Sequence, residues 1–296
     1  METTHTENAA KPAATLDVAS IVGLIVGLAG IVGGLLFEGG RIRDIAQFTA
    51  AMIVLGGTAG AVMVSTPLRV LKGGLRRAMR VLRDDTQPPE YMIGEVIRYA
   101  TKARKNGLVS LENEAMGIED RFLRKALTLA VDGTDLQEIR KMLELEIEIE
   151  ERQGEAEAKV FESAGGFAPT IGIIGAVMGL IQVMKNLANI DEVGHGIAVA
   201  FVATVYGVGS ANLLFLPFAC KIKSRVHAET QRKELILEGV GSIVEGMNPK
   251  LIRAKLEAYS RPEQSSKSGK PVAGSTRGAN GAGEEEHKSE ALAMET

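Results

Sequence analysis

The stretch SAGGFAPTIGIIGAVMGLIQVM, residues Ser163–Met184, contains 22 residues and no Asp, Glu, Lys, Arg or His. A helix needs about 20 apolar residues to cross the roughly 30 Å hydrocarbon core of a membrane. Three other blocks have this character: Val18–Phe37, Ile45–Leu68 and Ile197–Cys220. Four such blocks are unlike the buried helices of a soluble protein. The first block has no basic start and is longer than a signal-peptide core. We therefore predict an all-α integral membrane protein with four transmembrane helices and a helical cytoplasmic domain.

Composition excludes several other kinds of protein. The 296 residues carry a net charge of −3, so nothing favours a nucleic-acid partner. Cys220 is the single cysteine, which rules out an internal disulfide and a cysteine-based metal site. The four histidines are scattered, without metal-ligand spacing. We expect no cofactor, no metal and no enzymatic activity.

The charges between the blocks predict an orientation. Six Lys or Arg residues follow the second block in RVLKGGLRRAMRVLRDD, and five follow the fourth in KIKSRVHAETQRK. The loop Asn186–His195 holds two acids and no base, although Arg41 and Arg43 lie in the other short loop. Basic loops stay on the cytoplasmic side. We expect both basic segments and both termini in the cytoplasm, with the chain in a bacterial inner membrane.

These patterns divide the chain into six parts. We expect an N-terminal cytoplasmic segment (1–16), spans one and two (17–68), a cytoplasmic helical domain (69–162), spans three and four (163–220), a cytoplasmic helical extension (221–260) and a disordered tail (261–296).

Start and stop signals predict the cytoplasmic helices. One helix should begin at Pro88–Pro89 and end at about Asn106, before Gly107. A second should begin at about Ser110 as its N-cap. A third, capped by Asp135, should run directly into span three. Span four should continue to about Met247, where Asn248–Pro249 stops it.

The spans are rich in glycine and lack charge. Pairs with GxxxG spacing, such as Gly23/Gly27 and Gly175/Gly179, let helix backbones approach closely. A charged residue at mid-membrane costs about 2.5–3.5 kcal/mol on insertion scales and is kept for function. Because these spans have none, the chain could line an ion path, but a partner must supply the group that carries the ion.

Two prolines and several hydroxyl groups stand out within the spans. Pro169 lies near the start of span three, where a missing N–H is tolerated. Pro217, near the cytoplasmic end of span four, should give either a static kink or a hinge toward the following helix. Thr204 and the other span threonines should donate to the carbonyl one turn back, the ordinary structural role.

Taken together, several motifs resemble the MotA/PomA stator subunit family of the bacterial flagellar motor. They are LDVASIVGLIVGLAGIVGGLLFEGG in span one, KARKNGLVSLE in the cytoplasmic domain, GGFAPTIGIIGAVMGLIQVM in span three and AVAFVATVYGVGSANLLFLPFA in span four. The resemblance covers about Leu16 to Tyr259. The related ExbB and TolQ proteins are similar around spans three and four but typically have three spans.

The resemblance implies a mechanism and partners. Five such subunits would surround two copies of a single-span partner of the MotB/PomB type, whose Asp carries the ion. Ion flow would turn the ring about the partner, and the cytoplasmic domain would push the rotor switch protein.

The resemblance also assigns roles by motif. Thr204 in ATVYG matches the threonine that faces the partner's Asp, and Pro169 and Pro217 match the functional prolines at the span ends. Arg104 in KARKNG and Glu112 in VSLE match the charged pair that contacts the rotor; by themselves they would be ordinary solvated charges.

One position bears on the coupling ion. Sodium-driven members resemble GTxxGL in span three, where the threonine helps to strip water from sodium. This chain has GAVMGL, so Ala176 stands at that position. We expect protons to drive it.

Three other functions compete with this interpretation. An ExbB/TolQ-type energiser of an outer-membrane process is disfavoured by the span count and by the Arg104–Glu112 segment. A self-contained transporter would need its own coupling acid. A passive membrane scaffold is excluded by no single residue, and replacing Thr204 by Val would distinguish it from a stator.

Overall fold

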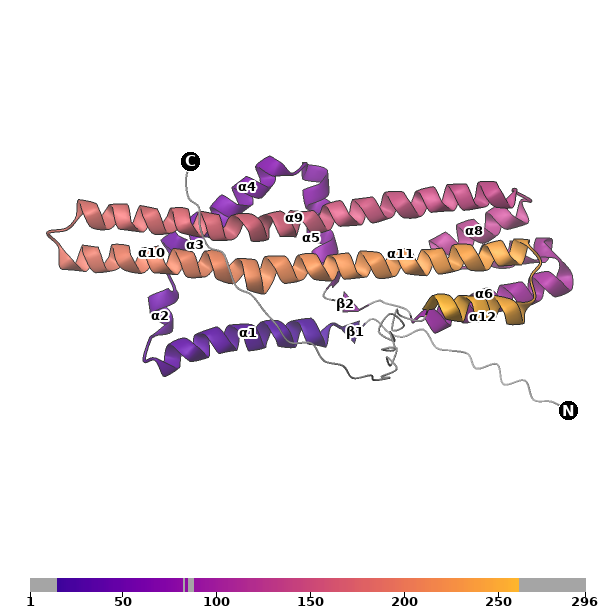
Figure 1. Ribbon diagram of the computed structural model, residues 1–296, viewed down its shortest axis with the longest axis horizontal. Helices are drawn as coiled ribbons and strands as arrows, with labels where there is room; N and C mark the ends of the chain where they lie inside the picture. The colour runs from indigo at the N-terminus through magenta and orange to yellow at the C-terminus, as the bar shows by residue number, and fades with distance from the viewer. Residues whose placement is uncertain (1–14, 82, 85–87, 261–296) are drawn as a thin grey trace, which may run out of the picture. The chain divides into compact units, whose positions relative to one another are not determined.

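The computed structural model describes residues 15–260 apart from residue 82 and residues 85–87 (Figure 1). The expected tail (261–296) and most of the N-terminal segment (1–16) lie outside the described residues. Helices form nearly all of the described chain. Its β-structure is one antiparallel pair, β1 (Thr15–Leu16) with β2 (Arg83–Asp84), in which Leu16 faces Arg83. The predicted all-α membrane fold is confirmed, because four helical segments are long and apolar enough to cross a membrane.

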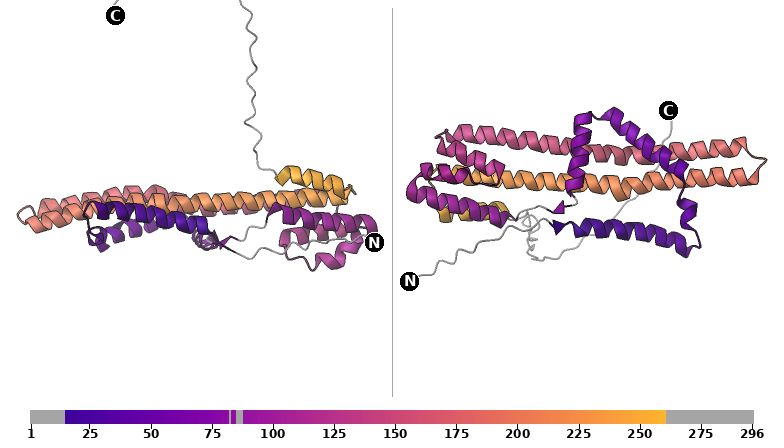
Figure 2. Two further views of the ribbon diagram at one scale, coloured as in Figure 1. Left: turned by 90° about the horizontal axis from the view of Figure 1, so that it is seen from below. Right: turned by 180° about the vertical axis from the view of Figure 1, so that it is seen from behind.

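Two long helical segments lie antiparallel along the described chain (Figures 1 and 2). One is α9 (Leu136–Lys185), a single helix of 50 residues. The other consists of α10 (Ile190–Ser210), the π-helical turn η3 (Ala211–Phe215) and α11 (Leu216–Val244). The Asp135 side chain accepts a hydrogen bond from the Gln137 amide and caps α9. The prediction that the acidic cytoplasmic helix continues into span three is confirmed.

Glycines let α9 and α10 pack backbone against backbone. A Cβ atom added at Gly179 would lie 2.7 Å from the Gly196 carbonyl oxygen, and one at Gly196 would lie 2.9 Å from the Gly179 carbonyl oxygen. One added at Gly172 would lie 2.9 Å from the Ala203 carbonyl oxygen. Real side chains essentially never make such contacts, so these positions need glycine.

The first two spans are α1 (Val18–Phe37) and a segment that begins at Phe48. The second comprises α3 (Phe48–Ala51), the π-helical turn η1 (Met52–Gly56) and α4 (Gly57–Ser65). A short helix, α2 (Ile42–Ile45), precedes it. The expected block Ile45–Leu68 is therefore too long at both ends. Thr66 is extended (φ −132°, ψ 132°) because the ring of Pro67 disfavours helical backbone in the residue before it.

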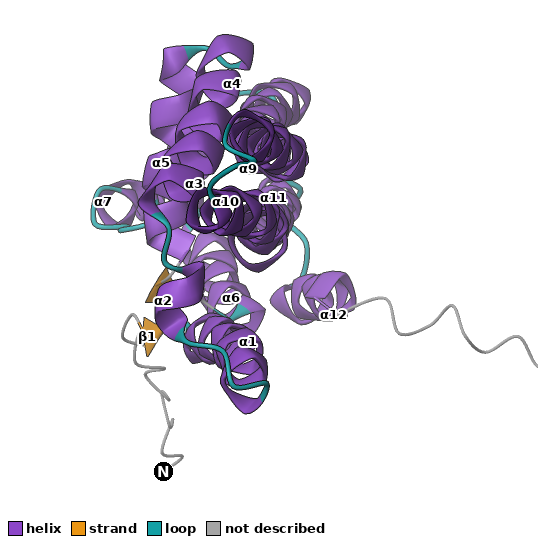
Figure 3. Ribbon diagram, turned by 90° about the vertical axis from the view of Figure 1, so that its left-hand side faces the viewer, coloured by secondary structure: helices purple, strands orange, loops and turns teal. Residues whose placement is uncertain are grey.

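Helix α5 (Leu68–Val81) follows directly and runs across the axis of α9 (Figures 1 and 3). It contains Gly74, Ala78 and Val81 on its buried face. The basic stretch after the second span is thus a helix of its own, packed against the long hairpin.

A small helical head packs on the end of the hairpin where α9 begins and α11 ends. Its elements are α6 (Pro89–Asn106), the 3-10 turn η2 (Leu108–Leu111), α7 (Glu112–Ala115), α8 (Arg121–Val131) and α12 (Pro249–Ser260). Large buried side chains of its core include Met92, Leu111, Leu123, Leu127, Ile139, Leu143, Ile236, Ile252 and Leu256. Both α9 and α11 contribute to this core, so head and hairpin form one packed body.

Three predicted helix boundaries can be compared with this head. The helix from Pro89 to Asn106 is confirmed, and Gly107 ends it with φ 83°. The helix expected from Ser110 is wrong, since Ser110 lies inside η2 and its hydroxyl donates to the Gly107 carbonyl at 2.7 Å. Helix α11 ends at Val244 rather than Met247, because Gly246 adopts φ 71°, and Pro249 begins α12.

Candidate functional site: the α9–α10 hairpin and the α6–α7 turn

Thr204 lies half-buried on α10, at the contact with α9. Its hydroxyl donates to the Ala200 carbonyl at 3.2 Å, the bond to the preceding turn that we expected. A Cβ atom added at Gly172 would lie 3.5 Å from the Thr204 Cα atom, which places this turn of α10 directly against α9. Because this bond uses the hydroxyl hydrogen, the Thr204 oxygen can still accept a hydrogen bond from a further group.

Ala176 lies half-buried on α9, next to the tight contact of Gly175 with Ala203. Ala176 lies on α9 and Thr204 on α10, the two helices of the same hairpin. The Ala176 methyl group offers no oxygen, so Thr204 supplies the side-chain oxygen of this pair.

Pro169 occupies the interior of α9, not the start of a helix. Our sequence-based explanation of why it is tolerated is therefore wrong. A proline inside a helix removes the hydrogen bond to the carbonyl four residues earlier, here that of Gly165. Gly207 approaches this irregular turn. A Cβ atom at Gly207 would lie 2.6 Å from the Ala168 carbonyl oxygen and 3.3 Å from the Pro169 Cα atom.

Pro217 is exposed in the first turn of α11, immediately after η3. In η3 the Leu216 amide bonds to the Ala211 carbonyl, five residues earlier. A π-helical turn inserts extra length into an α-helix and often marks a functional position. The turn η3 lies directly before Pro217, and the kink or hinge that we expected from this proline stays a prediction.

An ion pair that we did not predict joins the start of α1 to α11. Asp17 caps α1 by accepting from the Ser20 amide at 3.2 Å, and Lys221 in α11 pairs with its carboxylate. The hydrogen bond from Lys221 holds the pKa of Asp17 below its ordinary value, against a smaller opposing effect of burial. The capping Asp before an apolar run could have been found in the sequence, but its partner is 204 positions away.

Arg104 and Glu112 lie on either side of the turn at Gly107. Arg104 is exposed in the last turn of α6, and Glu112 is the exposed first residue of α7. Beneath them Lys102 of α6 pairs with Glu114 of α7. Among the described residues, neither Arg104 nor Glu112 forms an ion pair, so both charges face solvent on one end of the head.

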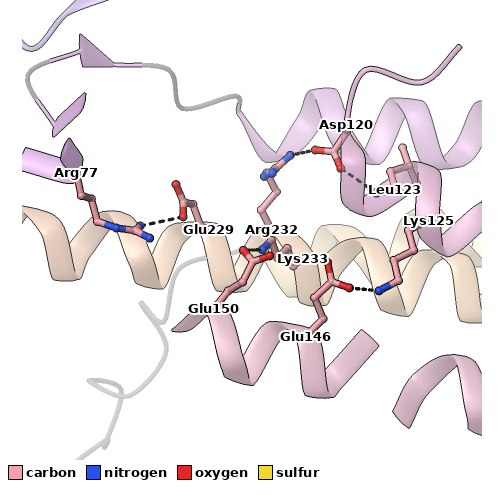
Figure 4. Close-up of polar contacts among 9 residues, drawn as sticks. All are labelled: Arg77, Asp120, Leu123, Lys125, Glu146, Glu150, Glu229, Arg232 and Lys233. Carbon is pink, nitrogen blue, oxygen red and sulfur yellow. Dashed lines mark hydrogen bonds and ion pairs between the residues drawn. The ribbon is translucent and has the colours of Figure 1, made fainter. Parts of the chain in front are cut away.

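A cluster of ion pairs fixes the head to the hairpin (Figure 4). Asp120 caps α8 by accepting from the Leu123 amide at 2.8 Å and pairs with Arg232 of α11. Lys125 of α8 pairs with Glu146 of α9. Burial tends to raise the pKa of Asp120, but its bonds from the Leu123 amide and Arg232 outweigh this effect and lower the pKa.

Lys233 adds a buried ion pair between the same helices. It is 9% exposed, pairs with Glu150 of α9 and lies 5.5 Å above the ring of Phe122 in α8. A buried ammonium group that lost these partners would be left desolvated and unpaired. The α6–α7 turn is therefore held at a defined position relative to the long hairpin.

Comparison with known proteins gives consistent matches along this chain. A family model described as "Motility protein A N-terminal" matches residues 21–106, and one described as "MotA/TolQ/ExbB proton channel family" matches residues 114–235. Motility protein A of Bacillus subtilis is 35% identical over 82% of this chain and 91% of its own length. The chain belongs to the motility protein A family.

Other relatives of this motility protein A family member support the assignment. Chemotaxis protein PomA of Vibrio alginolyticus is 32% identical over 82% of this chain and 95% of its own length. A solved structure of C. jejuni MotAB superposes with a TM-score of 0.79 at 31% identity, covering 82% of this chain and 96% of that one. The flagellar MotAB stator complex of Bacillus subtilis gives 0.76 at 34% identity, with coverages of 83% and 96%.

The motility protein A fold presented here offers no metal site within its described residues, since no three His, Cys, Asp or Glu side chains converge there. What its hairpin does offer is a hydroxyl, a proline-interrupted turn and a π-helical turn at successive levels.

Proposed function

We propose that this chain is a stator subunit of the bacterial flagellar motor. Together with a single-span partner of the MotB type it forms an ion channel and converts ion flow into torque on the rotor. One observation carries the proposal: the chain matches solved MotAB stator proteins over 82–83% of its own length. The spans contain no residue able to carry an ion, which agrees with a division of labour between two kinds of subunit.

The ion would enter along the α9–α10 hairpin and be taken up by an Asp of the partner. When that Asp is protonated, its O–H can donate to the Thr204 oxygen, and the turns at Pro169 and Pro217 respond to the change of charge of the Asp. An ion that crosses 100 mV releases about 2.3 kcal/mol, enough for a stepwise rotation. Five copies of this chain would surround two copies of the partner, in the inner membrane, with both termini in the cytoplasm.

The coupling ion in this proposal is the proton. Sodium must lose its water shell to pass, and oxygen ligands help it do so. Ala176 provides a methyl group where sodium-driven relatives would carry a threonine. A proton moves between the partner's carboxylate and water without such a ligand.

The end of the head that carries Arg104 and Glu112 would contact the rotor switch protein. Two exposed charges of opposite sign on a rigid support favour recognition of a complementary pair, mainly through specificity and rate of association. No catalytic step is proposed, because the output is mechanical.

Charge reversal on the head tests the rotor contact. Replacing Arg104→Glu should reduce swimming speed, and reversing an acidic charge on the rotor should restore part of it. Lys141→Glu is the matched control, because Lys141 is an exposed base on α9 and not on α6 or α7. Swimming unchanged by Arg104→Glu would remove this role.

A second candidate is an ExbB/TolQ-type energiser, favoured by the family model that also covers those proteins. The separate match of residues 21–106 to the motility protein A N-terminal model favours the stator. Deleting the gene decides between them: a stator mutant loses motility with an intact outer membrane, whereas an energiser mutant keeps motility.

A further inference from the structure

Helix α5 is held on the long hairpin in one rotational orientation. Gly74 packs so closely that a Cβ atom there would lie 3.0 Å from the Glu157 carbonyl oxygen of α9. Arg77 donates from Nε to the buried Glu157 carboxylate at 2.6 Å and from a terminal nitrogen to Glu229 of α11 at 3.3 Å. This clamp fixes which sides of α5 face away from the protein.

One outward side of α5 is apolar. Leu68, Leu75 and Met79 are spaced by seven and four residues, which puts them on one stripe of a helix with 3.6 residues per turn. They are 61%, 59% and 61% exposed. Three large apolar side chains in a row, all uncovered, indicate a surface meant for an apolar environment.

The adjacent outward side is basic. Four exposed bases follow one another along it: Arg69, Lys72, Arg76 and Arg80. The stretch Leu68–Val81 contains no acidic residue that could neutralise them. Arg77 points instead to the protein, so the four form a stripe that is free to meet an anionic partner.

The position of α5 identifies the apolar environment. Only Thr66 and Pro67 separate it from α4, whose end is the cytoplasmic end of span two in the proposed orientation. Figures 1 and 3 show α5 running across the axis of α9, whereas a spanning helix runs along it. It therefore lies at the level where acyl chains give way to headgroups, in the plane of the membrane.

We propose that α5 binds anionic phospholipids of the cytoplasmic leaflet, with its apolar stripe in the acyl-chain boundary and its basic stripe on the lipid phosphates. This inference rests on the proposed orientation of the chain. Amphipathic helices with bases beside an apolar face take this position, and each base near an anionic membrane adds to the binding. The clamp of Arg77 and Glu157 would transmit the anchorage to α9.

Lipid retention tests the basic stripe. The full chain, purified with its single-span partner, is reconstituted in nanodiscs of equal parts phosphatidylglycerol and phosphatidylcholine, and native mass spectrometry counts the retained phosphatidylglycerol. Replacing Arg69, Lys72, Arg76 and Arg80 together by Gln should weaken retention by about fivefold per base. The matched control replaces four exposed bases outside α5: Lys141, Arg152, Lys250 and Arg253.

Retention equal to that of the control would overturn the proposal. So would a quadruple variant that keeps its phosphatidylglycerol but breaks into smaller assemblies, because that result would assign the stripe to a neighbouring copy. The measurement does not depend on ion flow or swimming, so a failure of the proposed stator function would appear in motility and not here.

A second measurement applies even where the quadruple variant fails to assemble. Met79→Cys in a Cys220→Ser background carries a fluorescent label, and phospholipids brominated near the headgroup should quench it. Lys141→Cys in the same background serves as the control that should not be quenched. Absence of quenching at position 79 would show that lipid does not reach the apolar stripe.

Discussion

The Thr204 hydroxyl donates to the Ala200 carbonyl, and its oxygen can still accept a hydrogen bond. Replacing Thr204→Val keeps the shape of the side chain but removes that oxygen. We expect loss of ion flux and torque with little change in the thermal stability of the complex. Thr204→Ser, which restores the hydroxyl, should recover part of the flux, as measured with vesicles loaded with a pH-sensitive dye and by swimming speed. Full torque with Val at this position would assign Thr204 a packing role only.

Asp120 gives a stability prediction with a defined pH dependence. Because its pKa is lowered in the folded protein, its ion pair with Arg232 stabilises the fold above the ordinary carboxyl pKa of about 3.9. That contribution is lost as the pH falls through the lower folded value. Asp120→Asn keeps a capping side chain but removes the charge. It should cost about 1–3 kcal/mol at neutral pH.

The matched control for Asp120 is Asp135→Asn, which also changes a capping Asp but at an exposed position without an ion pair. From pH 7 down to about pH 4, thermal unfolding should show a constant difference in stability between the two variants. Below about pH 4 this difference should become smaller. A gap that grows on acidification would contradict the assigned direction of the pKa shift.

Sequence patterns were sufficient for some of these side chains and not for others. Asp135 and the end of α6 at Gly107 could be predicted because a cap or a left-handed glycine acts within a few residues. The pairing of Asp17 with Lys221 could not, since it depends on how two distant segments meet. Arg104 and Glu112 were found through family resemblance, because an exposed charge has no local signal of its own.

The α9–α10 hairpin depends on its glycines at the points of backbone contact. Gly196→Ala would place a methyl group 2.9 Å from the Gly179 carbonyl oxygen and should destabilise the complex by about 1–3 kcal/mol. Gly194→Ala, two residues earlier in the same helix, meets nothing within 4 Å and should be neutral or slightly stabilising. Thermal unfolding of the purified complex compares them, and equal melting temperatures would show that the contact relaxes without cost.

Boundaries of the helices were predictable where one residue decides them. The turn at Gly133 and the cap at Asp135 correctly started α9, and apolar length gave its membrane-spanning part. The π-helical turns η1 and η3 were not predicted from the sequence. Pro67 could have placed the end of α4 earlier, since the residue before a proline avoids helical backbone.

Because its four spans lack charge, we expect the chain to conduct ions only together with its partner. The chain reconstituted without its partner should show no ion conductance, because none of its spans holds a titratable acid. With the partner present, proton flux should appear. Vesicles loaded with a pH-sensitive dye measure both cases, and proton flux through the chain alone would contradict the division of labour.

The nature of the ion is a property of the complete motor. With Ala176 in place of a sodium-binding oxygen, swimming should be unaffected when external sodium is replaced by potassium. It should stop when a protonophore collapses the proton gradient. Motility that follows external sodium and survives the protonophore would overturn the proton assignment.

The continuity of α9 has a mechanical consequence. At 1.5 Å per residue its 50 residues extend about 75 Å, from the membrane's far side to the head, without an intervening loop. Although Pro169 removes one hydrogen bond within it, the helix is unbroken, so motion at one end is passed to the other. Small displacements beside Thr204 would therefore be passed along α9 to the head with little loss of amplitude.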